Sequence, residues 1–225
     1  MLKAAWRIAG KDLRLVLSGG VGLAQPVLLG LLLIFVFSLS RPAGEIVPPS
    51  AAAGIFWLAT LFSQVLIFNT LYSLEESSGA RLALLLSPVP AQSIWLGKCL
   101  AGGFLLIVSQ LVFAPAAVAF LSQGLSGSWP GALGALVMVD FGIVVMGSLL
   151  GALSQGQAAR ESLLSIVLFP LLVPVLLAGI RIGQAFFEGK GYGELSGWFG
   201  MGLAFDAIFA GAALVLFPFI YSGED

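Results

Sequence analysis

Six long apolar runs, each with few charged residues, dominate this sequence. They cover residues 21–39, 52–72, 100–122, 131–153, 163–183 and 197–221. At roughly 1.5 Å per helical residue, each run is long enough to cross the roughly 30 Å hydrocarbon core of a bilayer. With 59% hydrophobic residues, 9% charged residues and a mean hydropathy of +1.07, the chain has too little polar surface for a soluble globule. We therefore predict an all-α membrane protein with six transmembrane helices.

The residue types that are scarce limit the chemistry of the chain. Its formal net charge is −1, it has no histidine, and its single cysteine is Cys99. A net charge this close to zero argues against a nucleic-acid partner. A single cysteine forms neither an internal disulfide nor a zinc site. Besides Met1, the only thioethers are Met138, Met146 and Met201, so axial haem ligands are poorly provided. We predict a non-catalytic chain that binds no metal or cofactor alone.

Residues 1–19 are predicted to form a separate amphipathic helix. Lys3, Arg7, Lys11 and Arg14 fall within roughly 80° of one helical face, and apolar residues occupy the opposite face. A helix of this kind lies in the membrane interface with its cations against anionic headgroups. These four residues are therefore candidates for contact with the membrane surface, and residues 20–225 are the transmembrane domain.

A cleaved signal peptide is the alternative interpretation of the amino terminus. The run 21–39 could serve as its apolar region, and Ser38 and Ser40 are small enough for a cleavage site. The length of the run and the Arg41-Pro42 pair that follows it favour a first membrane span.

The basic residues between the runs indicate how the chain is oriented. The amino-terminal helix and alternate connectors hold Lys3, Arg7, Lys11, Arg14, Arg81, Lys98 and Arg160. The remaining connectors hold Arg41, Arg181 and Lys190. Because cytoplasmic loops are richer in Lys and Arg, we predict that both termini are cytoplasmic.

Prolines and one aromatic segment predict local irregularities. Pro115 lies in the third run, and Pro170 and Pro174 lie in the fifth. Each removes a backbone donor, so the fifth helix should kink or unwind and face the bundle or a cavity, although an ordinary proline kink is equally compatible. Residues 184–196 are predicted to be an external loop or a shallow re-entrant segment.

Two glycine pairs have the spacing that lets helices approach closely. Gly147 and Gly151 form one pair, and Gly179 and Gly183 form the other. We predict helix contacts at both pairs.

Asp140 and Asp206 lie inside the fourth and sixth runs. A carboxylate at the bilayer centre costs at least about 2.5 kcal/mol on insertion scales, so both are candidates for proton relay or substrate contact. The alternative is that one or both reach an interface or a hydroxyl of a neighbouring helix. No Lys or Arg stands at helical spacing to pair with them in these runs.

The connector over residues 74–98 carries the most informative pattern. Leu82, Leu85 and Leu86 share one face of a short predicted helix, and Pro88 and Pro90 end it before the chain re-enters the membrane at Lys98. An apolar face exposed to the cytosol requires a partner, unless the helix lies back on the bundle. The chain has no phosphate-binding loop of the G-x-x-x-x-G-K-[ST] kind, so ATP coupling would need a separate subunit.

Several motifs resemble a known family. The connector is similar to the coupling loop of type-2 ABC exporter permeases through Glu75-Glu76, Gly79, Leu84–Leu86, Pro88-Val-Pro90 and Lys98. With Gly54-Ile-Phe-Trp57 and Leu168-Phe-Pro-Leu-Leu-Val-Pro-Val175, the order of motifs over most of the chain resembles CcmB, the permease family of cytochrome c maturation.

The resemblance implies a bacterial inner-membrane subunit that pairs with a CcmA-like ATPase and with the membrane proteins CcmC and CcmD. ATP would bind the ATPase, and the complex would handle haem, either exporting it or releasing the haem-loaded chaperone CcmE from CcmC. A second copy of this chain would match two ATPase subunits. ATPase coupling is then expected at Glu75, Glu76, Gly79, Arg81, Leu85, Pro88 and Pro90, with the segment 1–19 as a lever.

Other functions remain as alternatives. A proton-coupled secondary transporter would use Asp140 and Asp206 as carriers. A passive scaffold for haem proteins would bind an ATPase without regulating it. An intramembrane enzyme is disfavoured because the sequence shows no nucleophile with an adjacent base.

Overall fold

The computed structural model describes residues 1–18, 21–40, 42, 45–124, 127–154 and 158–222, and side chains for these except at 21, 158–169, 192, 194 and 222. Helices make up the regular structure of this described part, and no strand occurs in it. In chain order they are α1 (Leu2–Ser18), α2 (Val21–Leu39), α3 (Pro49–Ser77), α4 (Ala80–Leu85), α5 (Ala91–Phe120), α6 (Trp129–Leu153), α7 (Ala158–Glu188), the 3-10 turn η1 (Tyr192–Leu195) and α8 (Ser196–Ser222).

Within the described residues, six helices are long and apolar enough to cross a membrane. They are α2, α3, α5, α6, α7 and α8, which confirms the number and order of the predicted spans. Several helices extend beyond their apolar run. α3 begins at Pro49 and reaches Ser77, because proline suits the first helical position and a helix satisfies its own backbone groups beyond the hydrocarbon as well as within it.

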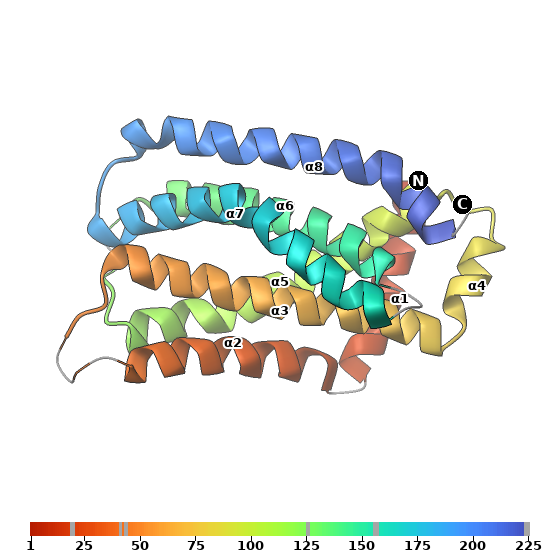
Figure 1. The fold of residues 1–225 in the computed structure, drawn as a ribbon, viewed down its shortest axis with the longest axis horizontal. Helices are drawn as coiled ribbons and strands as arrows, with labels where there is room; N and C mark the ends of the chain where they lie inside the picture. The colour runs from red at the N-terminus through yellow and green to blue at the C-terminus, as the bar shows by residue number, and fades with distance from the viewer. Residues whose placement is uncertain (19–20, 41, 43–44, 125–126, 155–157, 223–225) are drawn as a thin grey trace.

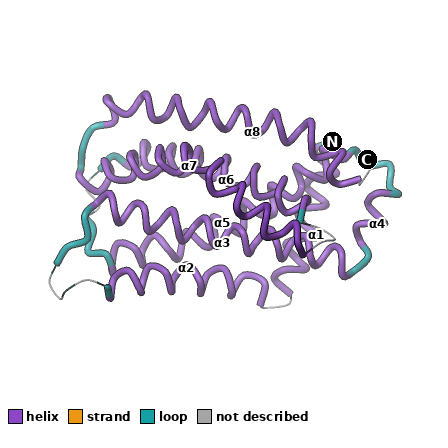
Figure 2. Tube along the Cα trace, in the orientation of Figure 1, coloured by secondary structure: helices purple, strands orange, loops and turns teal. Residues whose placement is uncertain are grey.

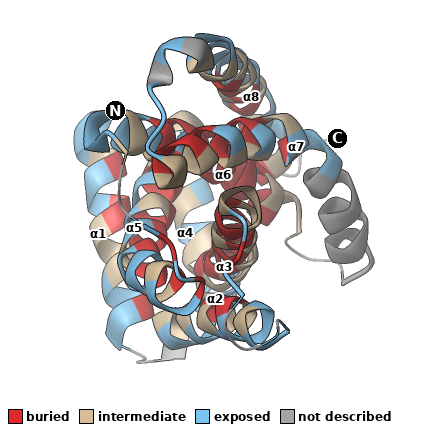
Figure 3. Cartoon of the chain, turned by 90° about the vertical axis from the view of Figure 1, so that its left-hand side faces the viewer, coloured by how far each residue is buried: buried red, intermediate tan, exposed pale blue. Residues whose placement is uncertain are grey.

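The spans lie side by side in an elongated bundle (Figure 1). α3 and α6 are the most buried spans, whereas α2 and α8 present most of their surface to the outside (Figure 3). The larger hydrophobic core joins α3, α5, α6, α7 and α8, and a smaller core joins α2 to α3 and α5. The bundle is a single unit, packed around two central helices.

Both termini and α4 lie at the same end of the bundle, and the connectors from α2 to α3, α5 to α6 and α7 to α8 lie at the other end (Figures 1 and 2). This arrangement groups the described members of the two predicted sets of basic residues at opposite ends. Arg41 and the acidic tail residues 223–225 lie outside the described residues, as does the side chain of Arg160.

α1 lies across the spans at the end that carries α4, packed mainly on α5 (Figure 1). The helix is amphipathic, as predicted, and its buried stripe consists of Ala5, Ile8, Ala9, Asp12 and Val16. Trp6, an apolar residue outside this stripe, is 73% exposed. α1 therefore packs on the bundle through a narrow stripe of buried residues, and the Trp6 side chain stays exposed.

The two expectations for the fifth span have different outcomes. α7 changes direction near its middle, and Pro170 and Pro174 lie within it (Figure 1). The interpretation of 184–196 as a loop or re-entrant segment is wrong in its first part, because residues 184–188 complete α7. Gln184 there donates a hydrogen bond to Glu188, one helical turn later, at 2.8 Å.

The predicted glycine pairs do mark close helix contacts. A Cβ at Gly147 would overlap the Gln64 amide, and one at Gly151 would press on the Tyr72 ring. On the other side of the core, a Cβ at Gly179 would meet the Trp57 ring at 2.8 Å. Helices approach closely at these positions because glycine has no side chain to hold them apart.

Candidate functional site

The connector between the second and third spans is shorter than predicted. α3 continues to Ser77 and α5 begins at Ala91, so residues 78–90 link them, with α4 in between. Gly79 precedes α4 at φ +69°, a left-handed conformation that other residues adopt only with strain. Pro90 immediately precedes α5 at φ −59°. Both neighbouring helices thus continue into the predicted coupling segment 74–98.

α4 carries an exposed apolar face. Leu82 is 67% exposed and Leu86 87% exposed, and α4 projects from the end of the bundle (Figure 1). The predicted coupling residues that are exposed are Glu76, Gly79, Leu85, Pro88 and Pro90. The helix does not fold back on the bundle, so this apolar face remains open.

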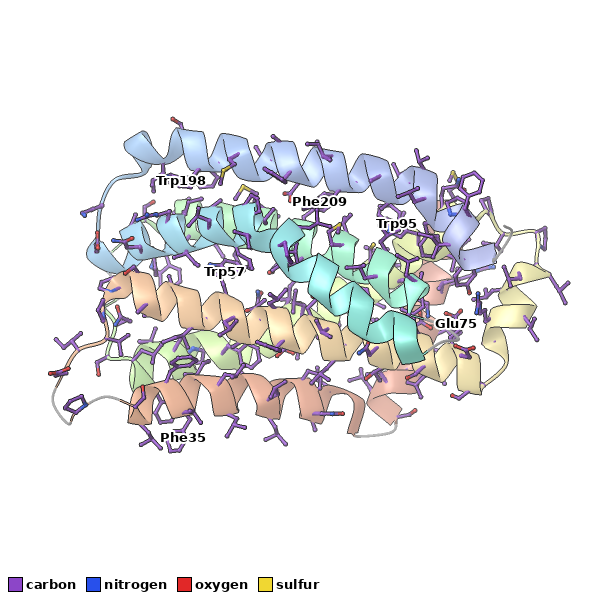
Figure 4. The ribbon with its side chains drawn as sticks, viewed as in Figure 1. Phe35, Trp57, Glu75, Trp95, Trp198 and Phe209 are labelled. Carbon is purple, nitrogen blue, oxygen red and sulfur yellow. The ribbon has the colours of Figure 1, made fainter. Side chains whose placement is uncertain are left out.

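Glu75 differs from the other predicted coupling residues because its side chain is fully buried. It lies at the end of the bundle next to α4 (Figure 4). The Glu75 carboxylate is 2.5 Å from the Lys98 ammonium, and Lys98 is also fully buried. Lys98, predicted where the chain re-enters the membrane, thus has its side chain inside the protein.

Two residues of α1 complete this buried ion cluster. Asp12 is 3.0 Å from the Lys98 nitrogen and 2.9 Å from that of Lys11. Lys11 also approaches Glu75, at 3.8 Å. We call Lys11, Asp12, Glu75 and Lys98 the ion cluster; its two cations and two anions balance in charge.

Aromatic and backbone groups enclose the cluster. The Lys98 ammonium donates a hydrogen bond to the Leu71 carbonyl at 3.2 Å and lies 4.9 Å from the centre of the Tyr72 ring. The Tyr221 hydroxyl donates to Glu75 at 3.1 Å. Because an isolated buried ion costs several kcal/mol, these partners account for how the charges tolerate burial.

α4 is also connected to the ion cluster. The Arg81 guanidinium donates to the Tyr221 carbonyl at 3.1 Å and lies 5.7 Å from the centre of the Tyr221 ring. Tyr221 in turn bonds to Glu75. α4 is thus linked through Arg81 and the end of α8 to the ion cluster, which joins α1, α3 and α5.

Sequence reasoning missed Asp12 as a partner of Lys98. Positions 5, 8, 9, 12 and 16 form one helical stripe, and Asp12 is the carboxylate within it. A charged residue in line with buried apolar positions is the pattern that could have identified it, since buried charges in proteins are paired.

The predicted membrane-surface residues fall into two groups. Lys3, Arg7 and Arg14 are exposed along α1, whereas Lys11 is half-buried and belongs to the ion cluster. The exposed three remain candidates for headgroup contact.

The two acidic residues inside the spans are buried and separate from the ion cluster. Asp140 accepts a hydrogen bond from Gln110 of α5 at 2.6 Å. Asp206 is 4% exposed and lies against the backbone of Gly142, where a Cβ would overlap its carboxylate. One oxygen of each carboxyl has no hydrogen-bond partner within the described residues.

An apolar cavity of about 470 Å³ lies in the half of the bundle away from α4. Its aromatic lining residues are Phe56, Trp57, Trp129, Phe186 and Phe187. The Trp129 and Phe186 rings meet edge to face with centroids 5.2 Å apart. Over the part of the chain that the structure describes, no group of three or more Cys, Asp or Glu side chains is arranged to hold a metal ion.

Six membrane-spanning helices, an amphipathic first helix and a projecting connector helix define an all-α, multi-pass membrane protein. The family described as CcmB protein matches residues 3–222, a range that contains the whole ion cluster and α4. The chain belongs to the CcmB family.

Individual relatives match over most of their length. The chain is 28% identical over 192 residues to heme exporter protein B of Rhodobacter capsulatus, covering 81% of this chain and 83% of that protein. It is 29% identical over 182 residues to the protein of the same name in Paracoccus denitrificans, covering 78% and 81%. The corresponding protein of Pseudomonas aeruginosa is 26% identical over 187 residues, with 81% of each chain covered.

Proposed function

We propose that this chain is the membrane subunit of an ABC-type complex for haem export and cytochrome c biogenesis, driven by a separate CcmA-like ATPase. Membership of the CcmB family and the name heme exporter protein B of its relatives support the cargo. The observation that carries the coupling role is the exposed apolar face of α4, held to the ion cluster through Arg81. The end that carries α4 and both termini then faces the cytoplasm of a bacterial inner membrane.

The ATPase docks on α4. Leu82, Leu85 and Leu86 offer an apolar surface that requires cover, and Glu76 provides an exposed charge beside it. Pro88 and Pro90 restrict the backbone between α4 and α5, so movement of α4 displaces α5 rather than being lost in a flexible loop. A dimer of this chain presents two such surfaces to two ATPase subunits.

The ion cluster transmits the movement of α4 into the bundle. Arg81 connects α4 to Tyr221, and Tyr221 connects to Glu75 and thus to Lys98 and Asp12. Ion pairs of this kind are stiff because each alternative arrangement leaves a charge buried without a partner. α1 moves with α3 and α5 as one body, which suits a lever at the membrane surface.

Haem is the cargo in this proposal, and the chain provides few axial ligands for it. The sequence contains no histidine, and Cys99 is buried near the ion-cluster end, away from the aromatic cavity. The cavity lined by Trp57 and Trp129 offers apolar and stacking contacts alone. Ligation therefore falls to the partners CcmC, CcmD and the chaperone CcmE, either during export or during release of haem-loaded CcmE from CcmC.

Polar substitutions on α4 test the docking surface. We expect Leu82→Ser combined with Leu86→Ser to lower co-purification of the ATPase at least tenfold, because burial of two leucines contributes about 1.5 to 3 kcal/mol each. The measurement is the amount of ATPase retained on the tagged, membrane-extracted chain, together with ATP turnover of the assembled complex.

Ile46 provides the matched control. It is 69% exposed at the opposite end of the bundle, so Ile46→Ser should leave the ATPase bound. Equal retention by the α4 double variant and the wild type would contradict the docking proposal.

A second candidate function is proton-coupled secondary transport. It is favoured by the buried carboxyls of Asp140 and Asp206, each with an oxygen that lacks a hydrogen-bond partner within the described residues. If these groups carry protons, an imposed proton gradient drives haem uptake into proteoliposomes that contain this chain alone.

In that case Asp140→Asn and Asp206→Asn should reduce gradient-driven uptake at least tenfold, because an amide cannot bind and release the proton. Glu45→Gln, in an exposed connector, is the control and should retain uptake. Uptake that needs the ATPase and survives both Asp→Asn changes argues against this candidate and for the first.

A further inference from the structure

Two hollows along α1 meet at Trp6 and Gly10. The first measures about 550 Å³ and is lined by α1 alone, by Trp6, Arg7, Gly10, Lys11, Arg14, Leu15 and Ser18. The second measures about 420 Å³ and lies between α1 and α5, lined by Trp6, Ala9, Gly10, Leu13, Cys99, Leu100, Gly103, Phe104 and Ile107. Together they place cations at one end of a continuous surface and apolar side chains at the other.

The cations of the first hollow are available to a ligand. Lys11 is held by Asp12 and Glu75, but Arg7 and Arg14 are exposed, and neither has an ion-pair partner in the part of the chain that the structure describes. Seven residues apart, the two arginines lie on the same face of α1, at a separation of roughly 10 Å along its axis. A guanidinium group can donate two parallel hydrogen bonds to two oxygens of one phosphate. The two arginines therefore suit a phosphate group.

The second hollow continues into the apolar part of the bundle. Leu100, Phe104 and Ile107 line it from α5 and are 38%, 50% and 47% exposed. They follow one face of α5 away from Lys98, over roughly 10 Å of helix. A ligand that fits both hollows has an anionic head and a hydrocarbon tail.

Gly10 lies where the two hollows join. A glycine within a helix is destabilising relative to alanine, and here a Cβ would meet nothing within 4 Å. Contact between helices therefore does not require glycine at this position, in contrast to Gly147. Its missing side chain keeps the passage between the cationic and the apolar hollow open.

We propose that α1 and α5 form a binding site for an anionic phospholipid. Arg7 and Arg14 hold the phosphate, and one acyl chain lies over Gly10 along Leu100, Phe104 and Ile107. The site is more specific than a general attraction of basic residues to a membrane, because Lys3, on the same helix, lines neither hollow.

Native mass spectrometry of the full chain in neutral detergent tests this site. Phosphatidylglycerol and phosphatidylcholine with identical acyl chains are titrated, and the retained lipid is measured. We expect phosphatidylglycerol to bind at least tenfold more tightly. Arg7→Gln combined with Arg14→Gln should remove that preference, a loss of roughly 10- to 30-fold for two cations near an anionic group.

Two further variants and one competitor separate the alternatives. Lys3→Gln should bind like the wild type, and a loss equal to that of the arginine pair would overturn the proposal in favour of diffuse attraction. Gly10→Phe fills the junction, where a Cβ meets nothing within 4 Å, and should weaken both lipids at least fivefold. Full displacement of phosphatidylglycerol by 50 mM inorganic phosphate, or equal binding of both lipids, would also overturn it.

Discussion

Replacing Lys98 with methionine is expected to lower the free energy of unfolding by about 3 to 5 kcal/mol, because it leaves two buried carboxylates with a single, half-buried cation. The Lys98 ammonium lies 2.5 Å from Glu75 and 3.0 Å from Asp12, and its side chain is fully buried. Unfolding in mixed micelles with increasing dodecyl sulfate, followed by tryptophan fluorescence, measures the change.

An exposed ion pair provides the control for this prediction. Lys190 pairs with Glu188 but is 69% exposed, so Lys190→Met should change the stability by less than about 1 kcal/mol. The double variant Lys98→Met with Glu75→Gln should recover part of the loss, since one uncompensated charge disappears with its partner. If Lys98→Met is as stable as Lys190→Met, the cluster does not hold these helices together.

Replacing Gly147 with leucine is expected to destabilise the bundle by about 3 kcal/mol, the upper part of the range for overpacked cores. Even a Cβ at this position would overlap the Gln64 amide and lie 2.7 Å from the Phe68 ring. Gln64 is itself fixed, since it donates a hydrogen bond to the Ile143 carbonyl at 3.1 Å. α3 and α6, the two central helices, must then separate.

The same substitution at Gly211 distinguishes packing from any general effect of leucine in a span. A Cβ at Gly211 meets nothing within 4 Å, so Gly211→Leu should change the stability by less than about 0.5 kcal/mol. Both variants are measured by the micelle titration used for Lys98. Equal midpoints for Gly147→Leu and Gly211→Leu would show that the two helices are not closely packed.

Particular residues show where sequence reasoning succeeded. The glycine pairs at 147 and 151 and at 179 and 183 were predicted from spacing and do contact neighbouring helices. Spacing along one helix reports which residues share a face, and a face of small residues allows close approach whichever helix lies opposite. For Asp140 and Asp206, by contrast, the sequence left open whether the side chains lie inside the bundle or reach an interface, and the structure buries both.

Other residues show where it failed. Glu75 was predicted as a coupling residue and Lys98 where the chain re-enters the membrane, and sequence reasoning did not foresee that both side chains are fully buried and paired with each other. The pairing was missed because a charge at the end of an apolar run was interpreted only as a sign that the span ends there. A charged side chain can be buried inside the protein when another helix supplies its counter-ion. Here α1 supplies it through Asp12.

The sequence by itself determined the class of protein, the six spans and their order, because a helix in hydrocarbon satisfies its own backbone groups and needs only a sufficient apolar length. It also indicated which connectors share an end of the bundle. The tertiary structure decided that Asp12, Glu75 and Lys98 meet, that α4 is attached through Arg81, and that two arginines of α1 adjoin an apolar groove on α5. These pairings depend on how helices distant in the chain pack against one another, and no local pattern of residues encodes that packing.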